Sequence, residues 1–422
     1  MLFAASIFLT LGVTAHWTDD LDLPPELLEY TVRNNKVLRK RCLEDNECPL
    51  DNSTLSNGRC WGFEEGCARK SSYSAERLKC NLPSDRQYEK SYQLDRFYHQ
   101  GDFGYIRSRN VMHTICISDS ADKSTLSCAD HLAYCTASNI FFDFKHLNAK
   151  DSKRYREDVI HNGDVGGNCD RFYPHVIEEQ GDRQGYLQSW IDELRHFESL
   201  DAFKVDDDHC DVIFDRPTIV IKLDAAVNMF HHFCDFINLY ASQFMNNTYF
   251  GKDVDILWWD TLPSVSSPHI ISIRCNMGLA QSVTAQIFKA RADHVCLPIR
   301  HLVDSTIVVR KSSSTRPSIS FSAALDSVGE CVNMHAGGFV DTYFGATWRA
   351  FSDRPPTELI SLDGKRVCFR QAVLPLLARQ IYGMYYNMPV IDGCWGSGLM
   401  HAFSHHLIHR LRIEQHGPIP DK

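Results

Sequence analysis

The sequence predicts an α/β protein built around a parallel β-sheet. Two runs rich in β-branched residues, CDVIF at 210–214 and TIVIKL at 218–223, are typical of short buried strands. Another buried-type strand, DILWW, follows at Asp255–Trp259, and an apolar helix at Val227–Leu239 lies between. Because strand, helix and strand follow one another in this order, we expect the strands to lie parallel in one sheet.

One narrow polar line interrupts the helix at Val227–Leu239, which is otherwise apolar almost all round. A helix of this kind is normally buried on every side. His231 and Asp235 lie one turn apart in this line, so their side chains share a face. A carboxylate fixes the tautomer of an imidazole and raises its basicity, as a general base requires. The residues alone support this catalytic pair and a merely structural buried polar network equally. The line consists of Asn228, His231, Asp235 and Asn238.

Composition and the N-terminus indicate a secreted type of protein. The 422 residues carry a net charge of −9, which does not support binding to nucleic acid or to an acidic membrane surface. An apolar run of roughly twelve residues ends at Val13-Thr14-Ala15, which predicts a signal peptide at 1–15. No later segment approaches the length of about eighteen apolar residues that a membrane span needs. We therefore expect neither a nucleic-acid partner nor a membrane span.

The cysteines indicate the same oxidising compartment. All sixteen follow Ala15, which favours disulfides over the alternative of a zinc knuckle, since no Cys-x-x-Cys pair occurs. Two sequons predict N-glycosylation at Asn52 and Asn246. Five of the cysteines crowd one short stretch: Cys42, Cys48, Cys60, Cys67 and Cys80.

Several motifs that resemble ligand sites have simpler explanations. Asp102-Phe-Gly occurs without the other kinase motifs, so we interpret it as a coincidence. The acidic runs Asp206–Asp208 and Asp253–Asp255 precede strands, whereas metal-binding carboxylates of nucleotide-sugar enzymes follow them, so we expect solvated residues. Histidines spaced by four on the last predicted helix, Ser397–Ile413, favour a solvated or hydrogen-bonded face over a zinc site. They are His401, His405 and His409, and we assign no metal ligand.

Five segments together resemble glycosyltransferase family 61. The resemblance covers roughly Pro24–Thr261 and Gly338–Gly417, and the motifs occur in the order found in that family. It implies an inverting enzyme that transfers N-acetylglucosamine from UDP-GlcNAc, the nucleotide-sugar donor, to Ser or Thr of EGF-like repeats in the lumen of the endoplasmic reticulum. The segments are GDFGY, LQSWIDELRHFESL, CDVIFDRPT, KLDAAVNMFHHFCDFINLY and GKRVCFRQAVL.

The resemblance also implies a fold and a set of site residues. The expected fold is GT-B, in which the active site lies between two Rossmann-like halves. The family motif of Asn, His and Asp matches Asn228, His231 and Asp235. We predict His231 as the general base or its partner, Asp235 as the residue that orients it, and His232 behind them. Donor-binding residues are not assigned. The alternative from another class is a non-catalytic secreted protein that binds EGF-like modules.

Three departures from the family pattern bear on activity. Relatives carry an Asp-Tyr-Asp triplet where this chain keeps only Asp353, followed by Arg354 and Pro355, so a role for a divalent metal stays open. Residues 262–337 are expected to be a non-native insertion. The C-terminal Rossmann-like half is expected to be missing, with its retention signal, which predicts an inactive chain that is either luminal or secreted.

The predicted organisation combines these inferences. A signal peptide at 1–15 precedes a Cys-rich, disulfide-stabilised region at 16–90 and a mostly helical region at 91–209. The first Rossmann-like half of the transferase covers 210–261 and 338–417, separated by the insertion at 262–337. A truncated linker covers 418–422.

Overall fold

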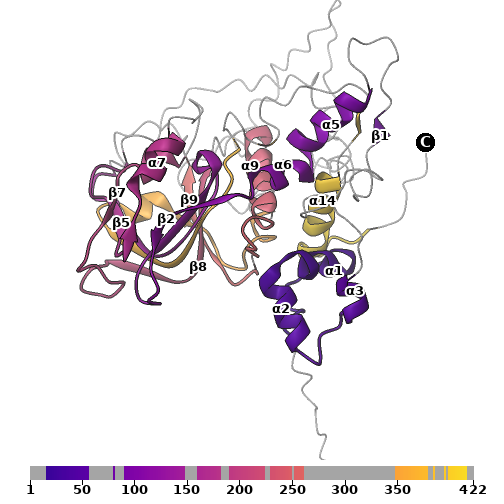
Figure 1. Cartoon of the computed structure of the whole chain (residues 1–422), viewed down its shortest axis with the longest axis horizontal. Helices are drawn as coiled ribbons and strands as arrows, with labels where there is room; N and C mark the ends of the chain where they lie inside the picture. The colour runs from indigo at the N-terminus through magenta and orange to yellow at the C-terminus, as the bar shows by residue number, and fades with distance from the viewer. Residues whose placement is uncertain are drawn as a thin grey trace, which may run out of the picture.

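Most of the labelled helices lie to one side of the main sheet in the computed structural model of the chain. Figure 1 shows the sheet on one side, helices α1, α2, α3, α5 and α14 on the other, and α9 between them. In the described part no helix is long and apolar enough to cross a membrane. The structure describes residues 16–56, 79–80, 90–147, 159–181, 190–223, 229–249, 251–260, 347–378, 384, 394–395 and 398–415.

Four parallel strands form one half of the main sheet, as the sequence predicts. Their order is β10–β9–β8–β11. The chain passes from β8 to β9 and β10 on one side, and then returns to β11 on the other side of β8. The direction of strand addition therefore reverses between β8 and β11. Their bounds are Val212–Leu223 for β8, Asp255–Asp260 for β9, Thr357–Glu358 for β10 and Arg366–Leu374 for β11.

The two strands predicted at 210–214 and 218–223 are one continuous strand, β8. The three residues between them are exposed, and Pro217 pairs with Gln371 where the register of β8 and β11 shifts. A proline has no backbone N–H to donate to a neighbouring strand, so it is tolerated where the ladder is irregular. The sequence misleads here because Pro217 is a typical strand breaker.

Antiparallel strands extend the sheet beyond β11, so the prediction of a mostly helical region at 91–209 is wrong. Six described strands lie in this region, and β4 pairs antiparallel with β11 along its length. These strands are rich in Thr, Ser and Cys and are fixed by pairing with distant segments, which local periodicity does not reveal. They are β2 (Met112–Ile117), β3 (Thr125–Ala129), β4 (Cys135–Asp143), β5 (Val165–Gly167), β6 (Arg171–Phe172) and β7 (Phe197–Ser199).

Helices cover both faces of the sheet. Alternate residues of β8 divide between two cores: Ile219 and Ile221 pack with α9, whereas Val220 packs with residues of α7 and α8. Period-two alternation in a strand produces this division. The helices are α1 (Pro25–Asn34), α2 (Lys36–Glu44), α3 (Asn52–Ser56), α5 (Lys90–Gly101), α6 (Phe103–Arg109), α7 (Pro174–Gly181), α8 (Ile191–Leu194), α9 (Met229–Ser242) and α14 (Gly398–Arg410).

The apolar run Leu359–Leu362, whose composition also suits a short strand, forms a 3₁₀ helix, η4, directly after the short strand β10. Leu359 and Leu362 are both buried, and their spacing of three brings them to the same side of a 3₁₀ turn. A short apolar run does not distinguish these two structures by periodicity. Gly364, with φ of +75°, turns the chain into β11.

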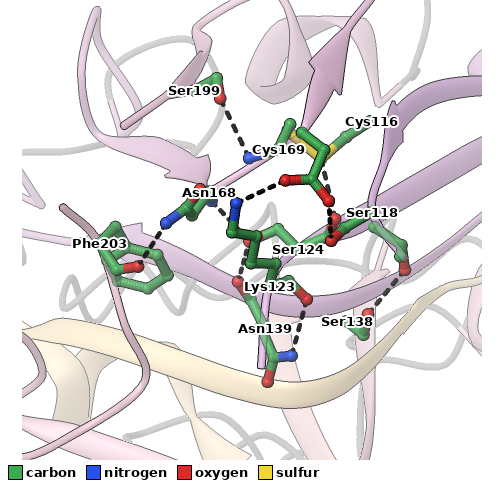
Figure 2. The surroundings of a disulfide bond; sticks show 12 residues. Cys116, Ser118, Lys123, Ser124, Ser138, Asn139, Asn168, Cys169, Ser199 and Phe203 are labelled. Carbon is green, nitrogen blue, oxygen red and sulfur yellow. Dashed lines mark hydrogen bonds and ion pairs between the residues drawn. A yellow bond between two sulfur atoms is a disulfide. The ribbon is translucent and has the colours of Figure 1, made fainter. Parts of the chain in front are cut away.

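Disulfides join segments of the fold as the cysteine content predicts. Cys210 precedes β8 and bonds to Cys368 in β11, 158 residues away. Figure 2 shows the Cys116–Cys169 disulfide beside Ser124, whose hydroxyl interacts with the carbonyl of Asn139 and the amide of Asn168. Among the described residues, Cys42–Cys48 and Cys128–Cys135 are also paired. A second, two-stranded sheet pairs β1 (Lys79–Cys80) with β12 (Cys394–Trp395).

Candidate active site

The fold places a candidate site at the carboxyl ends of β8 and β11. Ligands of open α/β sheets bind at this edge, where the strand order reverses. Helix α9 follows β8 in the chain and therefore begins at this same edge. The residues that the sequence predicts to be catalytic lie in its first two turns. Residues 224–228, including Asn228, lie outside the described part.

Helix α9 is buried on more than one side, as predicted from its apolar surface. Phe236 and Ile237 belong to the core that α9 forms with β8. On another side, Phe233 packs against Phe403 of α14, with 5.6 Å between ring centroids, and Phe236 stacks on Phe351. These contacts fix the helix between the sheet and α14, where Figure 1 also shows it.

His232 lies in an aromatic environment with 1% of its surface exposed. Its ring stacks on Phe236 at 4.7 Å and meets the ring of Trp258 edge to face at 5.4 Å. The indole N–H of Trp348 donates to Nε2 of His232 at 2.9 Å. Because an indole nitrogen can only donate, Nε2 carries no proton in this arrangement. His232 is thus fixed in one tautomer, and a direct catalytic role for it stays a prediction.

Among the other polar residues of α9, two link the helix to the segment beyond β11 and one lies near the candidate site. Asn238 is buried and donates to the carbonyls of Cys234 and Met384, so it links α9 to the segment beyond β11. Ser242 strengthens this link, because its hydroxyl accepts from the amide of Leu376. These contacts form a buried polar network, which is the structural alternative that the sequence supports as well as catalysis. Asp235 is also buried, with 2% of its surface exposed, and lies one turn nearer the site.

His231 lies in the first turn of α9, between Met229 and Asp235. Its backbone is described, but its side chain lies outside the described atoms. The predicted pairing of His231 with Asp235 therefore stays a prediction that rests on their helical spacing.

A buried ion pair beneath the same edge is a feature that sequence reasoning missed. Nζ of Lys222, the penultimate residue of β8, lies 2.7 Å and 2.9 Å from the two carboxylate oxygens of Glu193 in α8. Both side chains are at most 1% exposed. Burial raises the pKa of Glu193 to about 7, although the charge of Lys222 acts in the opposite direction. The available signal was a lone lysine in the apolar run TIVIKL.

Two indole rings flank the ammonium group of Lys222. It lies 5.4 Å from the ring of Trp190 and 5.7 Å from that of Trp259, within the range of cation–π attraction. Trp190 also donates its indole N–H to the carbonyl of Pro375, just after β11. The α8 region therefore connects the ends of β8 and β11, the two strands that border the candidate site.

The acidic motifs of the sequence lie away from this edge. Lys252 precedes β9, and its Nζ lies 2.5 Å from the carboxylate of Asp353, at the end of β9 opposite to the start of α9. Asp253 also precedes β9 and pairs with Arg354. Asp206 precedes β8 and pairs with His209. The structure thus separates Asp353 from the predicted catalytic residues of α9.

Asp102 has a structural role that explains the Asp-Phe-Gly tripeptide. Its Oδ1 accepts from the amides of Phe103 at the start of α6 and of Leu399 at the start of α14, both at 2.9 Å. One buried carboxylate therefore caps two helices. Gly104 allows this packing, because a Cβ there would lie 2.5 Å from the ring of Tyr98. The prediction that this motif has no kinase role agrees with these contacts.

The histidine series of α14 does not converge on one point in the described structure. The ring centroids of His401 and His405 lie 4.1 Å apart with the rings tilted by 46°, whereas Nε2 of His409 lies 3.1 Å from Asp22. His409 therefore lies beside a carboxylate of another segment, and the solvated or hydrogen-bonded face stays a prediction. His406 is fully buried between Tyr240 and Phe351.

Both predicted glycosylation residues are exposed. Asn52 begins α3, and Asn246 follows the end of α9 with φ of +49°. Exposure is necessary for attachment of a glycan, and modification of either residue stays a prediction.

Comparisons with known proteins agree with the resemblance noted in the sequence. The chain is 32% identical over 400 residues to the EGF domain-specific O-linked N-acetylglucosamine transferase of Mus musculus, covering 94% of this chain and 61% of that protein. The protein of the same name from Gallus gallus is 33% identical over 410 residues. The chain resembles these transferases along nearly all of its length.

The likeness extends to an insect member of the group. The transferase of this name from Drosophila melanogaster is 30% identical over 417 residues, covering 98% of this chain and 65% of its own length. The chain thus spans about three fifths of the length of the vertebrate transferases that it matches. No family model matches the chain, and no solved structure matches it.

Proposed function

We propose that this protein, against the expectation of an inactive chain, transfers N-acetylglucosamine from UDP-GlcNAc to Ser or Thr hydroxyls of EGF-like domains. The observation that carries the proposal is the likeness to transferases of that name over 94% of the chain. The strand order is compatible with it, because the order reverses beside the helix that carries the predicted base. The N-terminal signal and the disulfides favour action in the secretory pathway, with the endoplasmic reticulum lumen as the expected place.

The proposed chemistry is one in-line displacement at the anomeric carbon. The acceptor oxygen bonds to this carbon while the bond to the UDP oxygen breaks, and UDP leaves with the bonding electrons. His231 takes the proton of the acceptor hydroxyl, and Asp235 orients its imidazole and stabilises the imidazolium that forms. His232 positions the first turns of α9 through its hydrogen bond with Trp348.

The parallel strands are proposed to be the first Rossmann-like half of a GT-B fold. Two features support this: the order β10–β9–β8–β11 and the helix that follows β8. Asp353 does not fit the role of a metal ligand in the transfer, because it lies at the end of β9 opposite to the start of α9 and 66% of its side chain is exposed. We therefore assign no step of the transfer to a metal bound at Asp353.

The test combines transfer and donor binding on the full chain. A folded EGF-like domain and UDP-GlcNAc are incubated with the chain, and intact-mass spectrometry measures addition of one N-acetylhexosamine. Calorimetric titration measures binding of UDP-GlcNAc separately. Transfer that is lost in His231→Ala and kept in His175→Ala supports the proposal. Binding of the EGF-like domain with neither nucleotide binding nor transfer would contradict it and support the non-catalytic alternative.

A further inference from the structure

A second group of potential ligands lies at the opposite edge of the sheet. Strands β4 and β5 are antiparallel neighbours, and Phe142 pairs with Val165. The chain leaving β4 carries His146, and the chain entering β5 carries His161 and Asp164. This edge lies at the amino ends of β8 and β11, so it is remote from the start of α9.

We propose that His146, His161 and Asp164 bind a transition-metal cation, for which Zn²⁺ is the best match. One ligand atom from each residue lies within 4.8 Å of the other two. Oδ2 of Asp164 is 3.7 Å from Nε2 of His146 and 3.6 Å from Nδ1 of His161. Zinc binds nitrogen and oxygen at about 2.0–2.1 Å, so two ligands of a tetrahedral ion lie roughly 3.3 Å apart.

These separations are too long for hydrogen bonds and close to those of two ligands of one ion. The two imidazole rings meet edge to face with 4.7 Å between centroids, and one nitrogen of each lies less than 4 Å from the carboxylate of Asp164. A small movement of the half-exposed histidines brings all three ligands to bonding distance. Their side chains are 48% and 52% exposed, whereas that of Asp164 is fully buried.

The surroundings hold Asp164 in the orientation that the site requires. Its Oδ2 accepts from the backbone amide of His161 at 2.9 Å, and Nζ of Lys145 lies 2.7 Å from Oδ1. Outer contacts of this kind commonly orient a ligating carboxylate. The carboxylate of Asp143 lies 3.6 Å from Nζ of Lys145 and offsets part of its positive charge. Glu198 adds a further carboxylate beside Gly163.

The ligand set and the location indicate a stabilising cation. Two imidazoles and one carboxylate suit divalent ions such as Zn²⁺ and leave a fourth position for water. The ion would connect the end of β4 to the start of β5. Since this edge is opposite to the start of α9, the cation is expected to stabilise the protein without acting in sugar transfer.

The test measures metal binding directly on the full chain. Co²⁺ is titrated into the metal-free protein and followed by its visible absorption, which is intense for tetrahedral coordination, and Zn²⁺ is then added as a competitor. We expect one equivalent of Co²⁺ to bind and Zn²⁺ to displace it. His146→Ala and His161→Ala should each weaken binding by about 100-fold or more, because even outer-shell losses weaken metal sites by about 10–100-fold.

Control variants exclude other sites and misfolding. His175→Ala removes an exposed histidine of α7 and should bind like the wild type. His401→Ala/His405→Ala removes the neighbouring histidine pair of α14 and should also keep the signal. His146→Ala and His161→Ala should melt like the metal-free wild type. Only the wild type and the control variants should gain thermal stability with Zn²⁺. Absence of binding by the wild type, or unchanged binding in His146→Ala/His161→Ala, overturns the proposal.

Discussion

Lys222 and Glu193 form a fully buried ion pair beneath the carboxyl ends of β8 and β11. Removing one partner from such a pair leaves an uncompensated buried charge. We therefore expect Lys222→Met to lower the free energy of unfolding by about 3–5 kcal/mol. Urea denaturation followed by circular dichroism measures this loss.

The matched control for this prediction is the double variant Lys222→Met/Glu193→Leu. It removes both charges together, so it should recover most of the stability that Lys222→Met loses. A double variant as unstable as the single one would show that Lys222 acts through its packing between Trp190 and Trp259 and not through its charge.

Local sequence patterns predict the elements whose periodicity is strong. The β-branched runs of β8, the apolar run of β9 and the nearly all-apolar surface of α9 each indicate the correct type of element, although Pro217 divides β8 into two predicted strands. The strands between Met112 and Ser199 escape this reasoning, because partners distant in the chain determine their pairing. The 3₁₀ helix at Leu359–Leu362 escapes it because a run of four residues is too short to show a period.

The candidate site is predictable from the sequence only where it depends on local spacing. The spacing of His231 and Asp235 is a local feature that the sequence displays directly. The environment of His232 depends on Trp348, which is 116 residues away, and the partner of Lys222 is 29 residues away on another element. One sequence contains no signal for such contacts, because they arise only when the sheet brings these segments together.

The hydrogen bond from Trp348 to His232 provides the next prediction. Trp348→Phe removes the indole donor and leaves Nε2 of a buried imidazole without it. An unsatisfied buried polar group costs about 1–3 kcal/mol, so the free energy of unfolding should fall by that amount. A double-mutant cycle with His232→Leu isolates the pair in urea denaturation. If the two losses simply add, the hydrogen bond contributes nothing measurable.

His406 predicts a pH dependence of stability. Burial holds the pKa of His406 well below its usual value, and the charges of Arg410 and His409 lower it further. The unfolded chain therefore takes up this proton at a higher pH than the folded chain does. The contribution of neutral His406 to the free energy of unfolding is complete above about pH 6.5 and is lost as the pH falls below that value.

The measurement compares unfolding of the wild type and of His406→Leu at about pH 7.5 and about pH 5. The wild type should lose more stability on acidification, because its folded state excludes the proton. His175→Ala, which changes an exposed histidine, should follow the wild type. Equal losses in the wild type and His406→Leu would rule out His406 as the titrating group.

Asp102 caps α6 and α14 with the same carboxylate, so its loss should affect two helices. Loss of one N-cap costs about 0.5–2 kcal/mol, so Asp102→Ala, which removes two, should cost about 1–4 kcal/mol. Asp102→Asn keeps an oxygen in the place of Oδ1 and should cost less than half of this. Urea denaturation tests both variants, and equal losses would indicate that the negative charge matters more than the shared acceptor.

The last prediction concerns the first two turns of α9. If His231 takes the acceptor proton and Asp235 orients it, His231→Ala should lower kcat for transfer to a folded EGF-like domain by about 10²–10⁴-fold. Asp235→Asn is the better partner variant, because Asp235 is 2% exposed and Asn preserves its volume. It should lower kcat with little change in the KM for UDP-GlcNAc, because the charge acts when the imidazolium forms. Circular dichroism confirms the fold of each variant, and wild-type kcat in either one removes that residue from the mechanism.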